Sequence, residues 1–524
     1  MNKTNTKRIV RVLFITIFLV STAFTVSAKS KILTSAKGFD EADFDPLVDV
    51  VVTVEIEKIR SLEKFDWQIP TVEKIDWFND PDFYVKVFIN DGEFVSRVWH
   101  DTKYIYDPQW SATFNVPDDE EFVNIKIQLW DWNVGMDRLC DISSDYDGFK
   151  ERYDVEVIYD IKTGHWFGDD FTSDEATDLD PSGYGRLNGC DDNSIYQRDR
   201  DCELWFDIYQ NDYDGDGIPY WTEVNVYETD PEADNTGEDV DEDGVPIEWE
   251  NKWGHYFWYN WHDDIWESEW FYDPFVWEDH ANLDIDRDGL DNVEEFLTSQ
   301  WGSDPFRKDI FVELDQMEES PDGEKSILPE GSKELIRTSF DRQNIVYHLD
   351  DGYMGGSDII PFDHETSRDD LQSIYWNYFL HGDKDNWRRG VFHYGPVVYF
   401  APPGGFVFWG GVGPYLDSFV VSSHYFEVKY VIPKTNQRRN IVYGSAYMHE
   451  CGHTLGIFHG NTPGCDDQNG KFPWQRDWWI WRPYKSVMNY GYMYQIVDYS
   501  DGSRGKNDFD DWNRMDLTFF QREW

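Results

Sequence analysis

The first half of the chain alternates hydrophobic and polar residues in short runs that are separated by Asp, Asn, Gly and Pro. An alternation with a period of two places successive side chains on opposite faces of a strand, so these runs predict β-strands that bury one face. Several such strands in succession predict an all-β sandwich over residues 45–210. The predicted strands are residues 50–59, 83–90, 93–100, 111–117, 124–133, 155–161 and 202–209.

The last part of the chain, residues 305–524, mixes strand-like and helix-like patterns. Strand signals at 308–317, 344–352, 390–401 and 418–423 alternate with helical signals at 329–343 and 368–379, and a long helical segment follows within 440–460. This order predicts an α+β domain whose sheet precedes one long helix. With an acidic, loop-rich stretch at 211–304 between the two ends, the chain is predicted to be multidomain.

The N-terminus has the pattern of an export signal. Lys3, Lys7, Arg8 and Arg11 precede an apolar stretch, residues 12–26, and Ala28 completes a small-residue cleavage site. The sequence therefore predicts a signal peptide over residues 1–28 and a secreted or cell-surface protein. An uncleaved membrane anchor is the open alternative.

The charge balance of the chain limits the classes of macromolecule that it can bind. The 524 residues carry 103 Asp and Glu against 46 Lys and Arg, a formal net charge of −57. Because a polyanion repels other polyanions, nucleic acid is excluded as a partner. A hydrophobic content of 40% with 18% aromatic residues supplies enough apolar surface for the chain to fold despite this charge.

The charge is concentrated in residues 211–304, where one spacing occurs three times. In each repeat three Asp residues occupy positions 1, 3 and 5, a Gly occupies position 6 and a Glu occupies position 12. The acidic residues are Asp212, Asp214, Asp216 and Glu223 in the first repeat, Asp239, Asp241, Asp243 and Glu250 in the second, and Asp284, Asp286, Asp288 and Glu295 in the third.

This spacing is typical of a loop that wraps around Ca²⁺. Alternate carboxylates point inward, Gly allows the sharp turn, and the distal Glu can bind through both oxygens. The three repeats resemble calcium loops of the EF-hand and thrombospondin type-3 kinds, and this resemblance implies bound calcium at all twelve acidic positions. Solvated acidic turns are the alternative.

Acidic residues also lie at the loops of the predicted sandwich. Asp76 and Asp82 flank the start of one strand, and Asp131, Asn133 and Asp137 follow another. Together these segments resemble the two calcium loops of a C2 domain. The resemblance implies a C2-like fold with calcium binding and makes membrane binding through the sandwich a further possibility, although Asn133 stands where a carboxylate is usual. Loop acids without a bound ion are the alternative.

The long C-terminal helix carries His449-Glu450-x-x-His453. A step of four residues places both imidazoles on one helix face, one turn apart, as zinc ligation requires. Glu450 then lies beside the metal, where it can take a proton from the attacking water and later deliver it to the leaving amine.

The residues that follow this motif make the prediction of a catalytic zinc site more specific. Gly456 is predicted to end the helix in a left-handed conformation, and His459 follows as a third ligand, which leaves one position open for water. With Met488 in the segment Ser-Val-Met-Asn-Tyr, the pattern resembles the metzincin clan of zinc endopeptidases. That resemblance implies that Met488 lies beneath the zinc and that Tyr490 binds zinc or stabilises the oxyanion. A packed tyrosine is the alternative.

The sequence therefore predicts a secreted zinc metalloendopeptidase that is stabilised by calcium and acts on protein or peptide substrates. Zinc is expected at His449, His453 and His459, with Glu450 as the base. The alternative is a protein of a different functional class, a calcium-dependent surface-binding or adhesion protein with a vestigial protease domain. Zinc-dependent hydrolysis of a non-peptide bond is a third reading, because it uses the same metal chemistry.

Overall fold

The computed structural model describes residues 50–63, 75, 79–117, 120–144, 152–169, 185–190, 200–260, 265–402, 404–407 and 417–521. The predicted signal peptide and Asp76 lie outside these residues. Among these residues, the described parts of 52–114 and 122–521 group into one compact unit. No helix in the described ranges combines the length and the apolar character that a membrane crossing needs.

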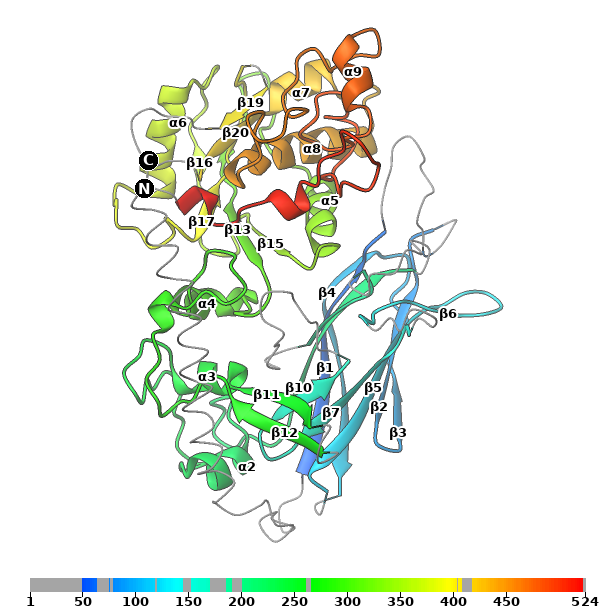
Figure 1. The fold of residues 1–524 in the computed structure, drawn as a ribbon, viewed down its shortest axis with the longest axis vertical. Helices are drawn as coiled ribbons and strands as arrows, with labels where there is room; N and C mark the ends of the chain where they lie inside the picture. Colours follow the sequence, from blue (N-terminus) through cyan, green and yellow to red (C-terminus); the bar gives the residue numbers. More distant parts are fainter. Residues whose placement is uncertain are drawn as a thin grey trace. The chain divides into compact units, whose positions relative to one another are not determined.

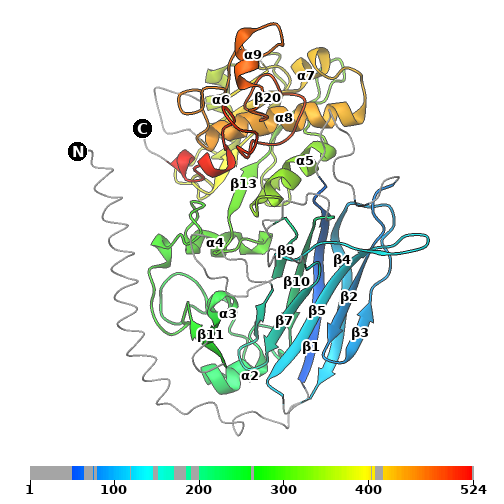
Figure 2. The same ribbon diagram turned by 45° about the vertical axis from the view of Figure 1, so that its right-hand side comes forward.

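Residues 50–209 form two antiparallel sheets that are layered as a sandwich (Figure 2), which confirms the predicted β-sandwich. The strands of the first sheet, in spatial order, are β4 (Tyr104–Val116), β1 (Val50–Ser61), β10 (Cys202–Tyr209) and β9 (Gly185–Asn188). Those of the second sheet are β3 (Gly92–Val95), β2 (Phe83–Ile89), β5 (Phe122–Asp131), β7 (Val155–Asp160) and β8 (His165–Gly168), with β6 (Arg138–Leu139) paired to β5. Exposed and buried residues alternate along β5, as a strand with one solvated face requires.

The acidic middle segment forms loops, short helices and one hairpin. Each Asp-rich repeat leads into a helix, and the Glu at position 12 lies in the first turns of that helical segment. The elements are α2 (Tyr220–Thr222), η2 (Glu223–Tyr227), α3 (Ile247–Trp253), β11 (His255–Asn260), β12 (Ile265–Trp270), η3 (His280–Asn282), α4 (Asn292–Thr298) and η4 (Ser299–Trp301). Trp249, Trp253 and Tyr272 of this segment belong to a buried cluster that also contains Trp205, Phe306 and Val346 from the flanking parts of the chain.

The C-terminal part combines largely parallel sheets with helices, in agreement with the predicted mixed α and β content. One sheet has the order β15 (Val346–Asp350), β13 (Asp309–Glu313), β17 (Phe392–Tyr394). The other has the order β16 (Ile359–Ile360), β14 (Gln316–Met317), β18 (Val397–Val398), β20 (Phe419–Ser422), β19 (Gly405–Val407). The helices are α5 (Glu330–Asp341), α6 (Arg368–Ile374), η5 (Tyr375–Phe379), α7 (Ser423–Lys429), α8 (Asn436–Thr454), α9 (Arg476–Trp481), η6 (Trp512–Arg514) and η7 (Phe519–Gln521).

Helix α8 is the central element of this part. It contacts α5 and β20 (Figure 1), and every residue from Ile441 to Thr454 is buried. The helix ends as predicted, because Gly456 has a φ of 84° and the Ile457 N–H donates to the Gly452 carbonyl over 3.0 Å. The chain therefore turns sharply just beyond His453.

We expect Gly456→Ala to lower the free energy of unfolding by about 1 kcal/mol or more, because a Cβ disfavours the left-handed conformation. The added Cβ would also lie 3.2 Å from Phe519 Cδ2. Urea unfolding of the metal-free protein measures the effect. Gly460→Ala is the matched control, since a Cβ there meets nothing within 4 Å. Equal losses in both variants would contradict the assignment.

Candidate metal centres

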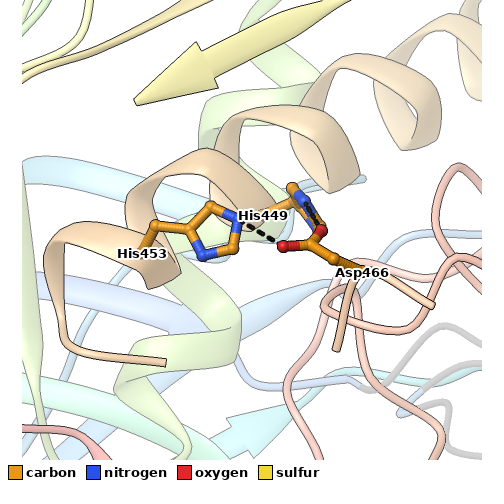
Figure 3. A group of neighbouring side chains, drawn as sticks. All are labelled: His449, His453 and Asp466. Atoms are coloured by element: carbon orange, nitrogen blue, oxygen red, sulfur yellow. Dashed lines mark ion pairs between the residues drawn. The ribbon is translucent and has the colours of Figure 1, made fainter. Parts of the chain in front are cut away.

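Helix α8 brings two of the predicted zinc ligands together. His449 and His453 are buried, at 2% and 7% exposure, and their ring centroids lie 4.9 Å apart. The one-turn separation follows from the four-residue step along the helix. Both rings face the segment that carries Asp466 (Figure 3).

All three predicted zinc histidines are anchored in the same way. The Nδ1 atoms of His449, His453 and His459 donate to the carbonyls of Val487, Ile457 and Cys465, over 2.9, 2.7 and 2.8 Å respectively. A carbonyl can only accept, so each bond holds a proton on Nδ1, and Nε2 is the nitrogen that a metal ion would bind in place of a proton. This second hydrogen bond is what orients a histidine for metal binding.

Asp466 is a further member of the site that the sequence interpretation missed. Its Oδ1 lies 3.2 Å from His449 Nε2, and its Oδ2 lies 3.4 Å from His453 Nε2. Ligand atoms on a tetrahedral zinc are separated by about 3.3 Å. The carboxylate therefore lies beside the point where the two nitrogens would hold zinc, and the donor atoms of the three residues lie within 4.8 Å of one another.

The electrostatics at this point favour a cation. Burial lowers the pKa of His449, but the hydrogen bond and charge of Asp466 outweigh it and raise that pKa to about 9. Burial would likewise raise the pKa of Asp466, yet His449, followed by His453, holds it well below its usual range. Asp466 thus stabilises positive charge on His449, whereas burial, followed by the charge of His449, lowers the pKa of His453 to about 4.

His459, the third predicted ligand, is exposed and is not part of the close group of His449, His453 and Asp466. Its bond to the Cys465 carbonyl places it near Asp466, the next residue. The signal that could have revealed Asp466 was modest: a carboxylate, which is a common zinc ligand type, seven residues beyond His459. Its proximity to the helix depends on how the loop after His459 folds back. Sequence periodicity does not encode such a return.

The segment around Met488 packs against helix α8 next to His449. Val487 supplies the carbonyl that anchors His449, and Met488 is fully buried. A Cβ on Gly452 would lie 2.7 Å from Met488 Sδ, so the glycine is what allows this approach to the helix. Tyr490 stacks on His449 with 5.5 Å between ring centroids. Burial and the neighbouring Asp466 raise the pKa of Tyr490 well above its usual value, so its hydroxyl stays protonated.

Glu450 lies next to the histidines and to the edge of the sheet. It is 6% exposed, and a Cβ on Gly405 of β19 would lie 2.7 Å from its Oε1. Burial raises the pKa of Glu450 to about 7, although the charge of His449 opposes the shift. A carboxyl group with that pKa can both accept and release a proton near neutral pH.

The three acidic repeats adopt the turn that their spacing predicts. Gly217, Gly244 and Gly289 have φ values of 89°, 110° and 105°. In the first repeat, Asp212 accepts hydrogen bonds from the N–H groups of Gly215 and Gly217, over 2.8 and 3.0 Å. The aspartates at positions 1, 3 and 5 form a close group in every repeat, with oxygens within 4.8 Å of one another.

The glutamates at position 12 of the three repeats show whether the lining of these loops suits a cation. Glu223, Glu250 and Glu295 are at most 2% exposed, and each has at least one carboxylate oxygen without a hydrogen-bond partner. Burial raises the pKa of Glu223 to about 7 and that of Glu250 to about 10. Buried carboxylate oxygens without donors are the ligands that Ca²⁺ prefers.

The acidic loops of the sandwich are different, because protein donors already satisfy their oxygens. Asp82 accepts from the Asp101 N–H over 2.7 Å, and Asp131 accepts from the Asn133 side chain over 2.6 Å. Asp137 accepts from the Tyr84 hydroxyl over 2.9 Å. These contacts hold the loops in place by hydrogen bonding within the protein.

Comparisons with protein-family models and with curated proteins find no match. Among solved structures, the chain is similar to human GIVD cytosolic phospholipase A2 in complex with methyl gamma-linolenyl fluorophosphonate. The identity is 14% and the TM-score 0.18, over 31% of this chain and 17% of that one. It is also similar to a C2 domain, at 12% identity and TM-score 0.18, over 31% of this chain and 98% of that one. A third similar structure holds two C2 domains of Extended-Synaptotagmin 2, at 13% identity and TM-score 0.19, over 32% and 42% of the two chains.

We expect Asp466→Asn to weaken zinc binding by about 10- to 100-fold, because the variant removes the carboxylate charge beside both Nε2 atoms. Competition with a chromophoric zinc chelator measures the change. Asp467→Asn is the control, since Asp467 accepts from Trp481 Nε1 over 2.9 Å and its loss leaves the Asp466 contacts in place. Unchanged zinc affinity in Asp466→Asn would show that this carboxylate does not act on the metal.

Proposed function

We propose that this chain is an exported zinc-dependent endopeptidase with a C2-like sandwich and a calcium-stabilised middle segment. The observation that carries the proposal is the anchoring of His449, His453 and His459. Each Nδ1 donates to a backbone carbonyl, so Nε2 is the nitrogen that each ring would offer to a metal. With these three histidines as the ligands, and Asp466 acting beside them through its charge, one zinc position would stay open, which distinguishes catalytic zinc from structural zinc.

The proposal assigns a proton-transfer role to Glu450. When bound, zinc would act as a Lewis acid that lowers the pKa of water and polarises a carbonyl. Glu450 would accept a proton from the attacking water and return it to the leaving amine. Its pKa of about 7 supports both transfers. The Tyr490 hydroxyl, which stays protonated, is hydrogen-bonded to Asp466, and it would turn from that carboxylate to donate to a developing oxyanion.

Strand β19 supports a peptide as the substrate. It is the last of the described strands in its sheet and pairs antiparallel with β20. An extended peptide could add to such an edge through backbone hydrogen bonds. Because Gly405 of β19 lies beside Glu450, the added backbone would pass close to the proposed base.

Calcium would stabilise the middle segment by screening its carboxylates. Residues 211–304 contain 29 acidic and two basic residues, counted along the sequence. A cation that binds the folded loops but not the unfolded chain stabilises the folded state by mass action. The buried oxygens of Glu223 and Glu295 that have no donor support this role.

We expect Glu450→Gln to reduce peptide hydrolysis by at least about 100-fold while the protein keeps its zinc, because the variant removes the base and none of the three histidines. Casein zymography and zinc content give the two readouts. Glu330→Gln changes an exposed glutamate of α5 and serves as the control. Equal activity in the wild type and Glu450→Gln would contradict the assignment. No activity in either, with zinc and calcium supplied, would favour an adhesion protein with a vestigial protease domain.

A calcium-selective chelator should expose the middle segment to trypsin. Within residues 211–304 trypsin can cut only after Lys252 and Arg287, so the expected new cleavages are fixed in advance. Mass spectrometry of the fragments identifies them, and added calcium should restore protection. A cleavage pattern that does not change with the chelator would contradict calcium binding by this segment.

A further inference from the structure

Four potential ligands from separate parts of the middle segment converge beside the second acidic repeat. They are Asp243 of the loop, Glu250 of α3, Glu278, and His280 at the start of η3, and their donor atoms lie within 4.8 Å of one another. His280 Nε2 lies 3.0 Å from Asp243 Oδ2, 3.7 Å from Glu250 Oε1 and 3.9 Å from Glu278 Oε2. Glu278 and His280 do not belong to the twelve-residue acidic repeat that contains Asp243 and Glu250.

Two of these four groups are fully buried, and several of the converging atoms have no hydrogen-bond partner. Glu250 and His280 are both 0% exposed. Both oxygens of Glu250, Oε2 of Glu278 and Nε2 of His280 lack a partner. Leaving a buried carboxylate unsatisfied costs several kcal/mol, so the arrangement points to a ligand at the centre of the group. This observation is independent of the clustering of acids.

The imidazole decides which ion fits. Calcium takes oxygen ligands, whereas imidazole nitrogen is a ligand of first-row transition metals. Trp249 and Tyr272 pack against the His280 ring, with centroids 5.7 and 4.9 Å away, and fix its position. A rigid nitrogen donor among three carboxylates is unlike a site made of oxygens alone.

Asn292 can set the tautomer of His280. Its Nδ2 lies 2.8 Å from His280 Nδ1, an arrangement that makes Nδ1 the acceptor. On metal binding, a rotation of the amide by about 180° lets Nδ1–H donate to the amide oxygen, and Nε2 then keeps its electron pair for the metal. The backbone supports the other side of the group, since the Glu278 N–H donates to Asp243 Oδ2 over 3.2 Å.

We infer that Asp243, Glu250, Glu278 and His280 form a binding site for a divalent transition-metal ion such as Zn²⁺, distinct from the histidine site on α8. The second repeat therefore differs from a simple calcium loop, and Asp243 belongs both to the aspartate group of that loop and to this site.

The test is the zinc content of the full-length protein after equilibrium dialysis against zinc with excess calcium, which saturates sites made only of oxygens. The expected result is about two zinc ions per chain in the wild type and about one in His280→Gln. His453→Gln should also retain about one, because it removes the other site. His364→Gln, which changes an exposed histidine, should retain about two.

The zinc contents of these variants distinguish a failure of this inference from a failure of the proposed function. Two zinc ions in His280→Gln, or one in the wild type that disappears in His453→Gln, would overturn the inference. Two in His453→Gln would count against the catalytic zinc and leave the inference intact. Glu278→Gln guards against a folding defect: circular dichroism should match the wild type while zinc affinity falls by about tenfold or more. Unchanged affinity in that variant would remove Glu278 from the ligand set.

Discussion

The hydrogen bond from His449 Nδ1 to the Val487 carbonyl is the interaction on which the candidate zinc site depends. It joins helix α8 to the turn at Met488, 38 residues later in the chain. The turn can approach because Gly452 leaves room for Met488 Sδ. The same contact orients the His449 ring against Tyr490 and directs its Nε2 toward Asp466. One backbone carbonyl thus couples the helix, the turn and the metal-binding face.

A second constraint is the burial of carboxylates in the middle segment. Glu250 and Glu295 lie in the first turns of α3 and α4, where the helix dipole favours negative charge. That effect contributes about 0.3–1 kcal/mol, whereas burying a carboxylate without partners costs several kcal/mol. The dipole therefore cannot offset the burial, and a bound cation can. We therefore expect the folding of residues 211–304 to depend on the metal ions that this segment binds.

The sequence predicted the features that follow from local spacing. The four-residue step placed His449 and His453 on one face of α8, and Gly456 and Gly217 adopted the left-handed conformations that their positions required. All seven predicted strands of the sandwich are present. The short strands β8 and β9 were missed, because four residues carry too little periodicity to stand out from a loop.

The missed site residues share a different cause. Asp466 reaches the histidines, and Glu278 reaches Glu250, only because the intervening chain folds back, and neither contact has a fixed sequence spacing. Loop closure of this kind is governed by packing and by buried donors such as the Glu278 N–H, which no period of two or 3.6 residues reports. Prediction from the sequence therefore extends as far as each repeat or helix turn and stops at the contacts between them.

The donor chemistry gives one chain a way to sort several metal ions. Protein sites cannot rely on affinity alone to select among divalent ions, because affinity follows a common order; ligand type and geometry make the distinction. The α8 site offers imidazole nitrogens held by carbonyls, and the first acidic repeat offers carboxylate oxygens. His280 adds a nitrogen to a group of carboxylates that would otherwise resemble the first repeat. In the proposed site this single side chain, positioned by Trp249 and Asn292, is what would change the ion that the second repeat prefers.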